Sequence, residues 1–167
     1  MRKSLIILAA LALAACSPGG LGPKAGNMSP AEAEAILQKA KGEPGARTTE
    51  SGVIYRIVRS GPADGMRPQL TDEVKVHYEG KLPDGRIFDS SYERGAPAAM
   101  PLRGLIEGWQ EALQLMRPGD EWILTVPPEL GYGAEGAGGG EIPGGAVLIF
   151  RIELIDVLPG PGRTGLG

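Results

Sequence analysis

Residues 73–91, EVKVHYEGKLPDGRIFDSS, decide the fold of this chain. Apolar and polar side chains alternate over residues 73–80, a pattern typical of a strand whose sheet faces water on one side. Proline, aspartate and glycine at 83–85 indicate a tight turn, and residues 86–88 return as a short strand. The stretch therefore predicts an antiparallel β-hairpin.

The period of two continues outside this hairpin and predicts three more strands. Two of them are residues 53–60 and residues 121–126, the latter ended by the proline pair at 127–128. The third has alternate apolar side chains that face inward, namely Leu148, Phe150, Ile152 and Leu154.

Apolar side chains recur at helical spacing over residues 108–116, and the pattern ends before Pro118 and Gly119. The apolar face of this predicted helix carries Trp109, Ala112, Leu113 and Met116. One short helix against several antiparallel strands is an α+β fold of two layers.

Length and composition fit one folded domain. The 167 residues are 42% hydrophobic and 22% charged, which allows a single modest core. The net charge of −3 leaves no basic excess to follow a phosphate backbone, so we expect no nucleic-acid partner. The single cysteine and the single histidine form neither an internal disulfide nor an ordinary zinc site, so we expect no metal.

Residues 1–15 resemble the signal peptide of a bacterial lipoprotein. Basic residues precede an apolar run from Leu5 to Leu13, and two alanines then precede Cys16. The run is too short to span a bilayer stably. The resemblance implies a mature chain that begins at Cys16 and is held on a membrane by lipid on that side chain. Because Ser17 rather than aspartate follows, we expect the outer membrane of the cell envelope, facing the periplasm.

Residues 16–47 combine this cysteine with a tether and a short helix. Glycine and proline gather early in this range, which favours a flexible tether. Ser29 and Glu32 form a capping-box pattern around Pro30, which predicts a helix of about twelve residues that ends near Gly42. The few apolar side chains of this helix offer too little area to predict a dimer, so we expect a monomer.

Two patterns suggest other functions but lack the context that those functions need. Residues 131–136 match the glycine fingerprint of dinucleotide-binding folds, but glycines at 138–140 follow where a helix would have to begin. His77 lies within a predicted strand, and no sequence motif presents a serine nucleophile beside it. We therefore expect a loop at 131–136 and a His77 that faces water.

Five short blocks occur in one order along the chain. They are residues 76–80 (VHYEG), 84–91 (DGRIFDSS), 105–109 (LIEGW), 130–133 (LGYG) and 148–150 (LIF). In this order and spacing the sequence closely resembles the FKBP-type peptidyl-prolyl cis-trans isomerases, in a bacterial lipoprotein form. The resemblance covers residues 48–158 and leaves residues 159–167 as a loose tail.

The resemblance implies a fold and a binding pocket. The fold is an FKBP-like antiparallel sheet of five or six strands wrapped around one short helix, in agreement with the elements predicted above. A pocket for the substrate would lie between helix and sheet, with the indole of Trp109 as its floor. The implied catalytic residues are Asp89, Tyr132, Tyr78 and Phe88. The implied substrate-binding residues are Ile106, Trp109, Phe150, Leu105, Met100 and Ile142.

The sequence departs from the family pattern at two places. After Pro97 the family usually has aromatic residues, whereas this chain has Ala98 and Met100, so we expect one wall of the pocket to be wider and softer. Glu141 lies where a branched apolar residue is frequent, so we expect different contacts at the mouth of the pocket.

The implied activity is the isomerisation of peptide bonds that precede proline in envelope proteins. Rotation about an amide breaks no covalent bond, so the reaction needs no nucleophile, metal or cofactor. The implied partners are unfolded or folding proteins that contain proline, and macrolide ligands. Ala98 and Met100 keep a second interpretation open: a proline-peptide-binding chaperone or adaptor lipoprotein with weak isomerase activity.

Overall fold

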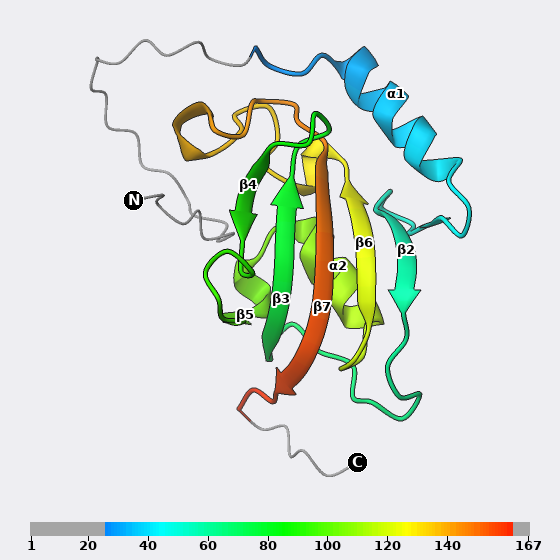
Figure 1. Cartoon of the computed structure of the whole chain (residues 1–167), viewed down its shortest axis with the longest axis vertical. Helices are drawn as coiled ribbons and strands as arrows, with labels where there is room; N and C mark the ends of the chain where they lie inside the picture. Colours follow the sequence, from blue (N-terminus) through cyan, green and yellow to red (C-terminus); the bar gives the residue numbers. More distant parts are fainter. Residues whose placement is uncertain (1–25, 162–167) are drawn as a thin grey trace.

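Strand β3 (Glu73–Lys81) organises the sheet, because three other strands pair with it. The structure is a computed structural model, and it describes residues 26–161 of the chain. All pairings are antiparallel, and the strand order is β1-β2-β6-β7-β3-β4, with β5 also paired to β3 (Figure 1). The other strands are β1 Arg47–Thr48, β2 Ile54–Arg59, β4 Ile87–Ser90, β5 Ala98–Pro101, β6 Glu121–Val126 and β7 Leu148–Leu158.

The sheet confirms the predicted α+β class and contains the hairpin of β3 and β4. It has seven strands rather than five or six, because β1 and β5 join it. These two strands have two and four residues, too few for an alternation of side chains to be recognised in the sequence.

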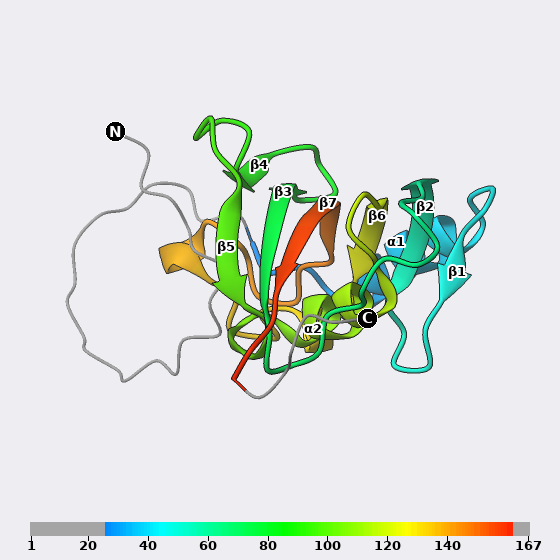
Figure 2. The same ribbon diagram turned by 90° about the horizontal axis from the view of Figure 1, so that it is seen from below.

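Helix α2 (Glu107–Leu115) covers the inner face of the sheet, as Figures 1 and 2 show from two directions. Its predicted apolar face is confirmed, since the following side chains are fully buried: Trp109, Ala112, Leu113 and, just after the helix, Met116. A Cβ at Gly108 would lie 2.6 Å from Cγ1 of Val126. Glycine at this position therefore lets α2 approach β6 more closely than any other residue would.

The outer face of the sheet is polar, as the alternation in residues 73–80 predicted. Along β3, Val74 and Val76 are fully buried, whereas Lys75 is exposed and His77 is half-buried. On the neighbouring strand β7, Arg151 donates to Glu121 at 2.6 Å across the outer face. This side of the sheet thus meets water, and the core lies between the other side and α2.

Helix α1 (Pro30–Lys41) lies beside β2 and packs loosely (Figures 1 and 2). Its capping box is confirmed, because the Glu32 N–H donates to the Ser29 Oγ at 3.3 Å and the Ser29 N–H donates to the Glu32 carboxylate at 2.8 Å. Only Ala33 of this helix is buried. A groove of about 500 Å³, lined in part by Ile36 and Pro83, lies between α1 and the turn that joins β3 to β4.

Three short 3-10 turns complete the described part of the chain: η1 Leu102–Gly104, η2 Pro128–Leu130 and η3 Gly138–Gly140. Residues 131–136 lie in the loop between η2 and η3, as predicted, and no α-helix follows them up to residue 161. No helix within residues 26–161 is long and apolar enough to cross a membrane. The predicted signal peptide, Cys16 and most of the tether lie outside the described residues, as does the end of the tail.

Candidate active site

Four aromatic rings from four elements meet on the inner face of the sheet. The Trp109 ring of α2 lies edge to face against Tyr78 of β3, with centroids 5.1 Å apart, and against Phe150 of β7, at 5.2 Å. Phe150 in turn meets Phe88 of β4 edge to face at 5.7 Å. Aromatic pairs prefer this geometry, and it adds stability beyond the burial of area. Trp109 thus contacts two of the other three rings directly.

A glycine in β3 makes room for this group. Gly80 pairs with Phe150 of β7 and with Asp89 of β4. A Cβ at Gly80 would lie 2.7 Å from atoms of both Phe150 and Phe88. The block VHYEG therefore does two things: it supplies Tyr78 to the site and leaves the space that the two phenylalanine rings occupy.

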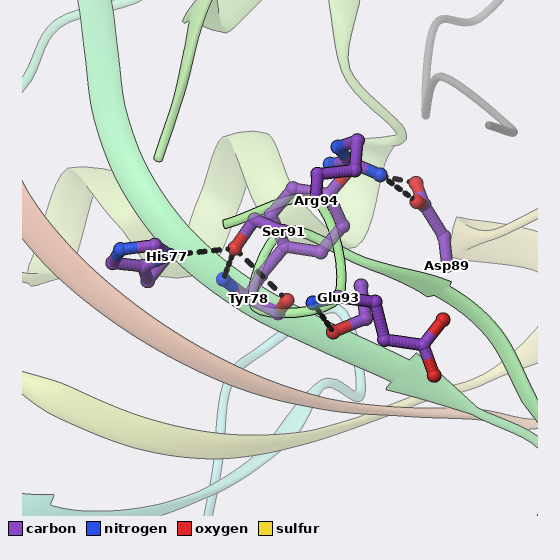
Figure 3. A network of polar contacts seen from close by, with 7 residues as sticks. His77, Tyr78, Asp89, Ser91, Glu93 and Arg94 are labelled. Atoms are coloured by element: carbon purple, nitrogen blue, oxygen red, sulfur yellow. Dashed lines mark hydrogen bonds and ion pairs between the residues drawn. The ribbon is translucent and has the colours of Figure 1, made fainter. Parts of the chain in front are cut away.

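A polar network borders the rings (Figure 3). The Tyr78 hydroxyl donates to the Asp89 carboxylate at 2.6 Å, and Arg94 donates both to that hydroxyl, at 2.7 Å, and to Asp89. The side chain of Asp89 is 1% exposed, so its charge is compensated mainly by Arg94. Burial, and next the hydrogen bond to Asp89, raise the pKa of Tyr78 far above its ordinary value. The Tyr78 hydroxyl therefore stays protonated and oriented.

Tyr132 contributes a second hydroxyl from the loop after η2. This hydroxyl is buried, and among the described residues it has no hydrogen-bond partner. Burial, and next the negative charge of Asp89, raise the pKa of Tyr132 to about 12. A buried donor without a partner is unfavourable, and such groups in native proteins commonly bind a ligand or water.

The remaining predicted site residues belong to the same core cluster, and they are Ile106, Leu105, Met100 and Ile142. Ile106 stands at the amino end of α2, and its backbone N–H donates to no group among the described residues. Ala98 is half-buried in β5 and packs against the cluster, whereas Glu141 is exposed. The structure thus places these four side chains in the core cluster that also contains Trp109, Tyr78, Phe88 and Phe150.

The sequence did not predict Arg94, which completes the polar network. It lies five residues after Asp89, in the turns between β4 and β5. A basic residue in a turn is common and predicts no contact. Only the return of the chain towards β3 shows that Arg94 reaches Asp89. Within residues 26–161, no group of three or more His, Cys, Asp and Glu side chains could hold a metal ion.

Comparisons with known proteins agree with this fold and with these blocks. The sequence model described as FKBP-type peptidyl-prolyl cis-trans isomerase matches residues 65–155. The chain is 48% identical over 126 residues to the peptidyl-prolyl cis-trans isomerase Mip of Coxiella burnetii, covering 75% of this chain and 54% of that protein. It is 47% identical over 128 residues to the FKBP-type 22 kDa peptidyl-prolyl cis-trans isomerase of Escherichia coli, covering 77% and 61%.

Solved structures give the same result. The crystal structure of FkpA from Escherichia coli superposes with a TM-score of 0.73 at 40% identity, covering 78% of this chain and 60% of that chain. A peptidyl-prolyl cis-trans isomerase from Pseudomonas syringae pv. tomato superposes with a TM-score of 0.72 at 36% identity, covering 80% and 100%.

The sheet, the helix α2 buried against it and the aromatic cluster define a domain of the FKBP class. The chain belongs to the FKBP-type peptidyl-prolyl cis-trans isomerase family. It spans a little over half the length of the two curated relatives described above.

Proposed function

We propose that this chain accelerates the cis-trans isomerisation of peptide bonds that precede proline. The observation that carries the proposal is the buried Tyr132 hydroxyl, which has no partner among the described residues and lies within the electrostatic influence of Asp89. A substrate carbonyl would accept a hydrogen bond from this hydroxyl, and another would accept one from the Ile106 N–H. Family membership supports the same activity.

The proposed mechanism is non-covalent. Resonance gives the amide a rotational barrier of roughly 18–20 kcal/mol and charge separation in its planar form. The twisted transition state has lost this resonance and is less polar, so surroundings that exclude water favour it over the planar ground state. A proline ring would contact the apolar side chains around Trp109, while Tyr78 and Asp89 would lie beside the rotating carbonyl. The reaction would need no cofactor.

One observation favours the second candidate, a binding module with weak isomerase activity. Trp109, Tyr78 and Phe150 are each at most 1% exposed, so their side chains pack against one another and cover the surface that a ligand would contact. Ala98, in place of an aromatic side chain, leaves less surface against which a proline ring could stack. Binding at such a site depends on movement of its rim, and catalysis would suffer more than binding.

The experiment that separates the two candidates measures catalysis and binding on the same protein. The purified chain is added to a protein whose slow refolding phase is limited by proline isomerisation. Macrolide binding is followed by the fluorescence of Trp109 in the variant Trp122→Phe, which keeps only that indole. An isomerase accelerates the slow phase and binds the macrolide. Binding without acceleration supports the second candidate. The absence of both acceleration and binding refutes both candidates.

We further propose that the domain works in the cell envelope. The lipoprotein-like residues 1–15 and the position of Cys16 support a lipid anchor, and Ser17 supports the outer membrane with the domain in the periplasm. The substrates would then be envelope proteins that contain proline, and the chain would act as a monomer. Metabolic labelling with a fatty acid tests the anchor: wild type is labelled, and Cys16→Ser is not.

A further inference from the structure

Ser91 closes a gap in the hydrogen-bond ladder of β3. On this side of the sheet, β3 pairs with β5 as far as Val76 and with β4 from Glu79 onward. No strand residue therefore pairs with Tyr78 there. The register of β3 and β4 would place Ser91 opposite Tyr78, but β4 ends one residue earlier, at Ser90. Ser91 is completely buried at this point.

The side chain of Ser91 supplies the contact that the missing strand pair would have made. Its Oγ accepts a hydrogen bond from the Tyr78 backbone N–H at 2.8 Å, and its own N–H donates to the Tyr78 carbonyl at 2.9 Å. The hydroxyl also lies 3.2 Å from that carbonyl oxygen. Since a buried backbone N–H without a partner is strongly unfavourable, Ser91 fixes the main chain of Tyr78.

The same segment holds the other end of Tyr78. The chain that leaves the sheet at Ser91 turns and returns Arg94, whose guanidinium donates to the Tyr78 hydroxyl and to Asp89 (Figure 3). Tyr78 is therefore bound at its main chain by Ser91 and at its hydroxyl by Arg94, three residues later in the sequence. A shift at Ser91 would move both ends of this arrangement.

His77, on the outer face of the sheet, limits the orientation of the Ser91 hydroxyl. Its Nδ1 lies 2.9 Å from the Ser91 Oγ, and its ring stacks on Tyr92 with centroids 4.7 Å apart and planes 11° apart. The hydroxyl thus has three polar neighbours at 2.8 to 3.2 Å: the Tyr78 N–H, the Tyr78 carbonyl and His77. These contacts leave the side chain one favourable orientation.

We propose that Ser91 is a positioning residue for isomerisation, which keeps the Tyr78–Asp89–Arg94 network aligned with the rotating carbonyl. The inference rests on the isomerase activity proposed above and assigns Ser91 no contact with substrate. Because the network acts on the twisted amide while apolar side chains bind the proline ring, losing the alignment lowers kcat and leaves KM nearly unchanged.

The test measures kcat and KM on a proline peptide for Ser91→Ala, alone and combined with Arg94→Ala. We expect Ser91→Ala to lower kcat about tenfold at unchanged KM, because a buried hydrogen bond is lost. If Ser91 acts through the network, the same change in the Arg94→Ala background lowers kcat less than about twofold. Should Ser91→Ala fail to fold, Ser91→Cys keeps the shape of the side chain with a slightly larger atom that forms weaker hydrogen bonds, and we expect a loss of about threefold.

Ser90→Ala is the matched control. Ser90 is the last residue of β4 and is 3% exposed, and its Oγ accepts from the Glu93 N–H rather than from Tyr78. We expect this variant to keep wild-type kcat. Equal losses in both serine variants, or a wild-type kcat in a folded Ser91→Ala protein, overturn the inference while the proposed activity stands. Wild-type kcat in both Arg94→Ala and Asp89→Asn would refute the proposed site and therefore also this inference.

Discussion

Two tryptophans are buried in the core on the inner side of the sheet, and only one of them lies beside a polar network. Trp122 of β6 stacks on Tyr55 of β2, with centroids 4.5 Å apart and planes 10° apart. Trp109 meets Tyr78 edge to face, and the hydroxyl of that tyrosine is bound by Asp89 and Arg94. Both indole N–H groups are buried without a partner among the described residues.

The comparison shows which features define the site. Buried rings and an unpaired indole N–H occur in both groups, so they are not sufficient. What distinguishes the Trp109 group is a charged pair at its border and the buried Tyr132 hydroxyl within reach of that charge. We therefore expect changes near Trp122 to affect stability alone, and changes near Trp109 to affect catalysis as well.

The largest expected effect comes from truncating the two indoles. Trp109→Ala and Trp122→Ala each remove a buried ring, and each should lower the free energy of unfolding by about 3–5 kcal/mol. At a temperature where both variants are folded, Trp109→Ala should lose its isomerase activity, and Trp122→Ala should keep it. Urea unfolding and the peptide assay measure the two quantities. An active Trp109→Ala protein would contradict the proposed floor of the site.

Removing the charge at the border should have the next largest effect. Asp89→Asn keeps the shape of the side chain but leaves Arg94 without its carboxylate, and we expect isomerase activity to fall about 10- to 100-fold. Unfolding measured in parallel should show a smaller loss, about 1–3 kcal/mol, since one charged hydrogen-bond partner is gone. Arg86→Ala is the control, because its partner Asp84 lies in an exposed turn. Equal activity in the two variants would contradict the proposed functional difference between the Trp109 group and the Trp122 group.

The Tyr132 hydroxyl should affect catalysis with little effect on folding at neutral pH. Among the described residues it has no partner to lose, and an unpaired buried donor is unfavourable, so Tyr132→Phe should resist urea at least as well as wild type. If the hydroxyl binds a substrate carbonyl, kcat/KM should fall about tenfold. The control Tyr55→Phe changes a tyrosine of the other group, and we expect its kcat/KM to match that of wild type.

Alkaline pH provides a second measurement on Tyr132. Because its pKa is raised in the folded state to about 12, its contribution to stability is complete below about pH 10 and is lost as the pH rises towards 12. Wild type should therefore lose stability more steeply than Tyr132→Phe over this interval. Urea unfolding at several pH values measures the difference. Parallel curves would show that the hydroxyl ionises as easily in the folded chain as in the unfolded one.

The fold could be predicted from the sequence because its main strands are long enough to show a period of two. The helical face of residues 108–116 was equally clear, since Trp109 and Leu113 lie one turn apart. Arg94 and Ser91 could not be predicted in the same way. Their partners are set by a change of neighbouring strand along β3, from β5 to β4, which leaves no periodic pattern.

The smallest expected effect is at α1, which contributes no residue to either aromatic group. Ser29→Ala removes one half of the capping box, and caps of this kind contribute about 1 kcal/mol to helix stability. Because α1 buries only Ala33, we expect hydrogen exchange to quicken in residues 30–41 while isomerase activity stays at the wild-type level. A loss of activity would mean that α1 supports the site through the groove beside the β3–β4 turn. That turn leads directly to Phe88 and Asp89, so the groove would then be the route of the coupling.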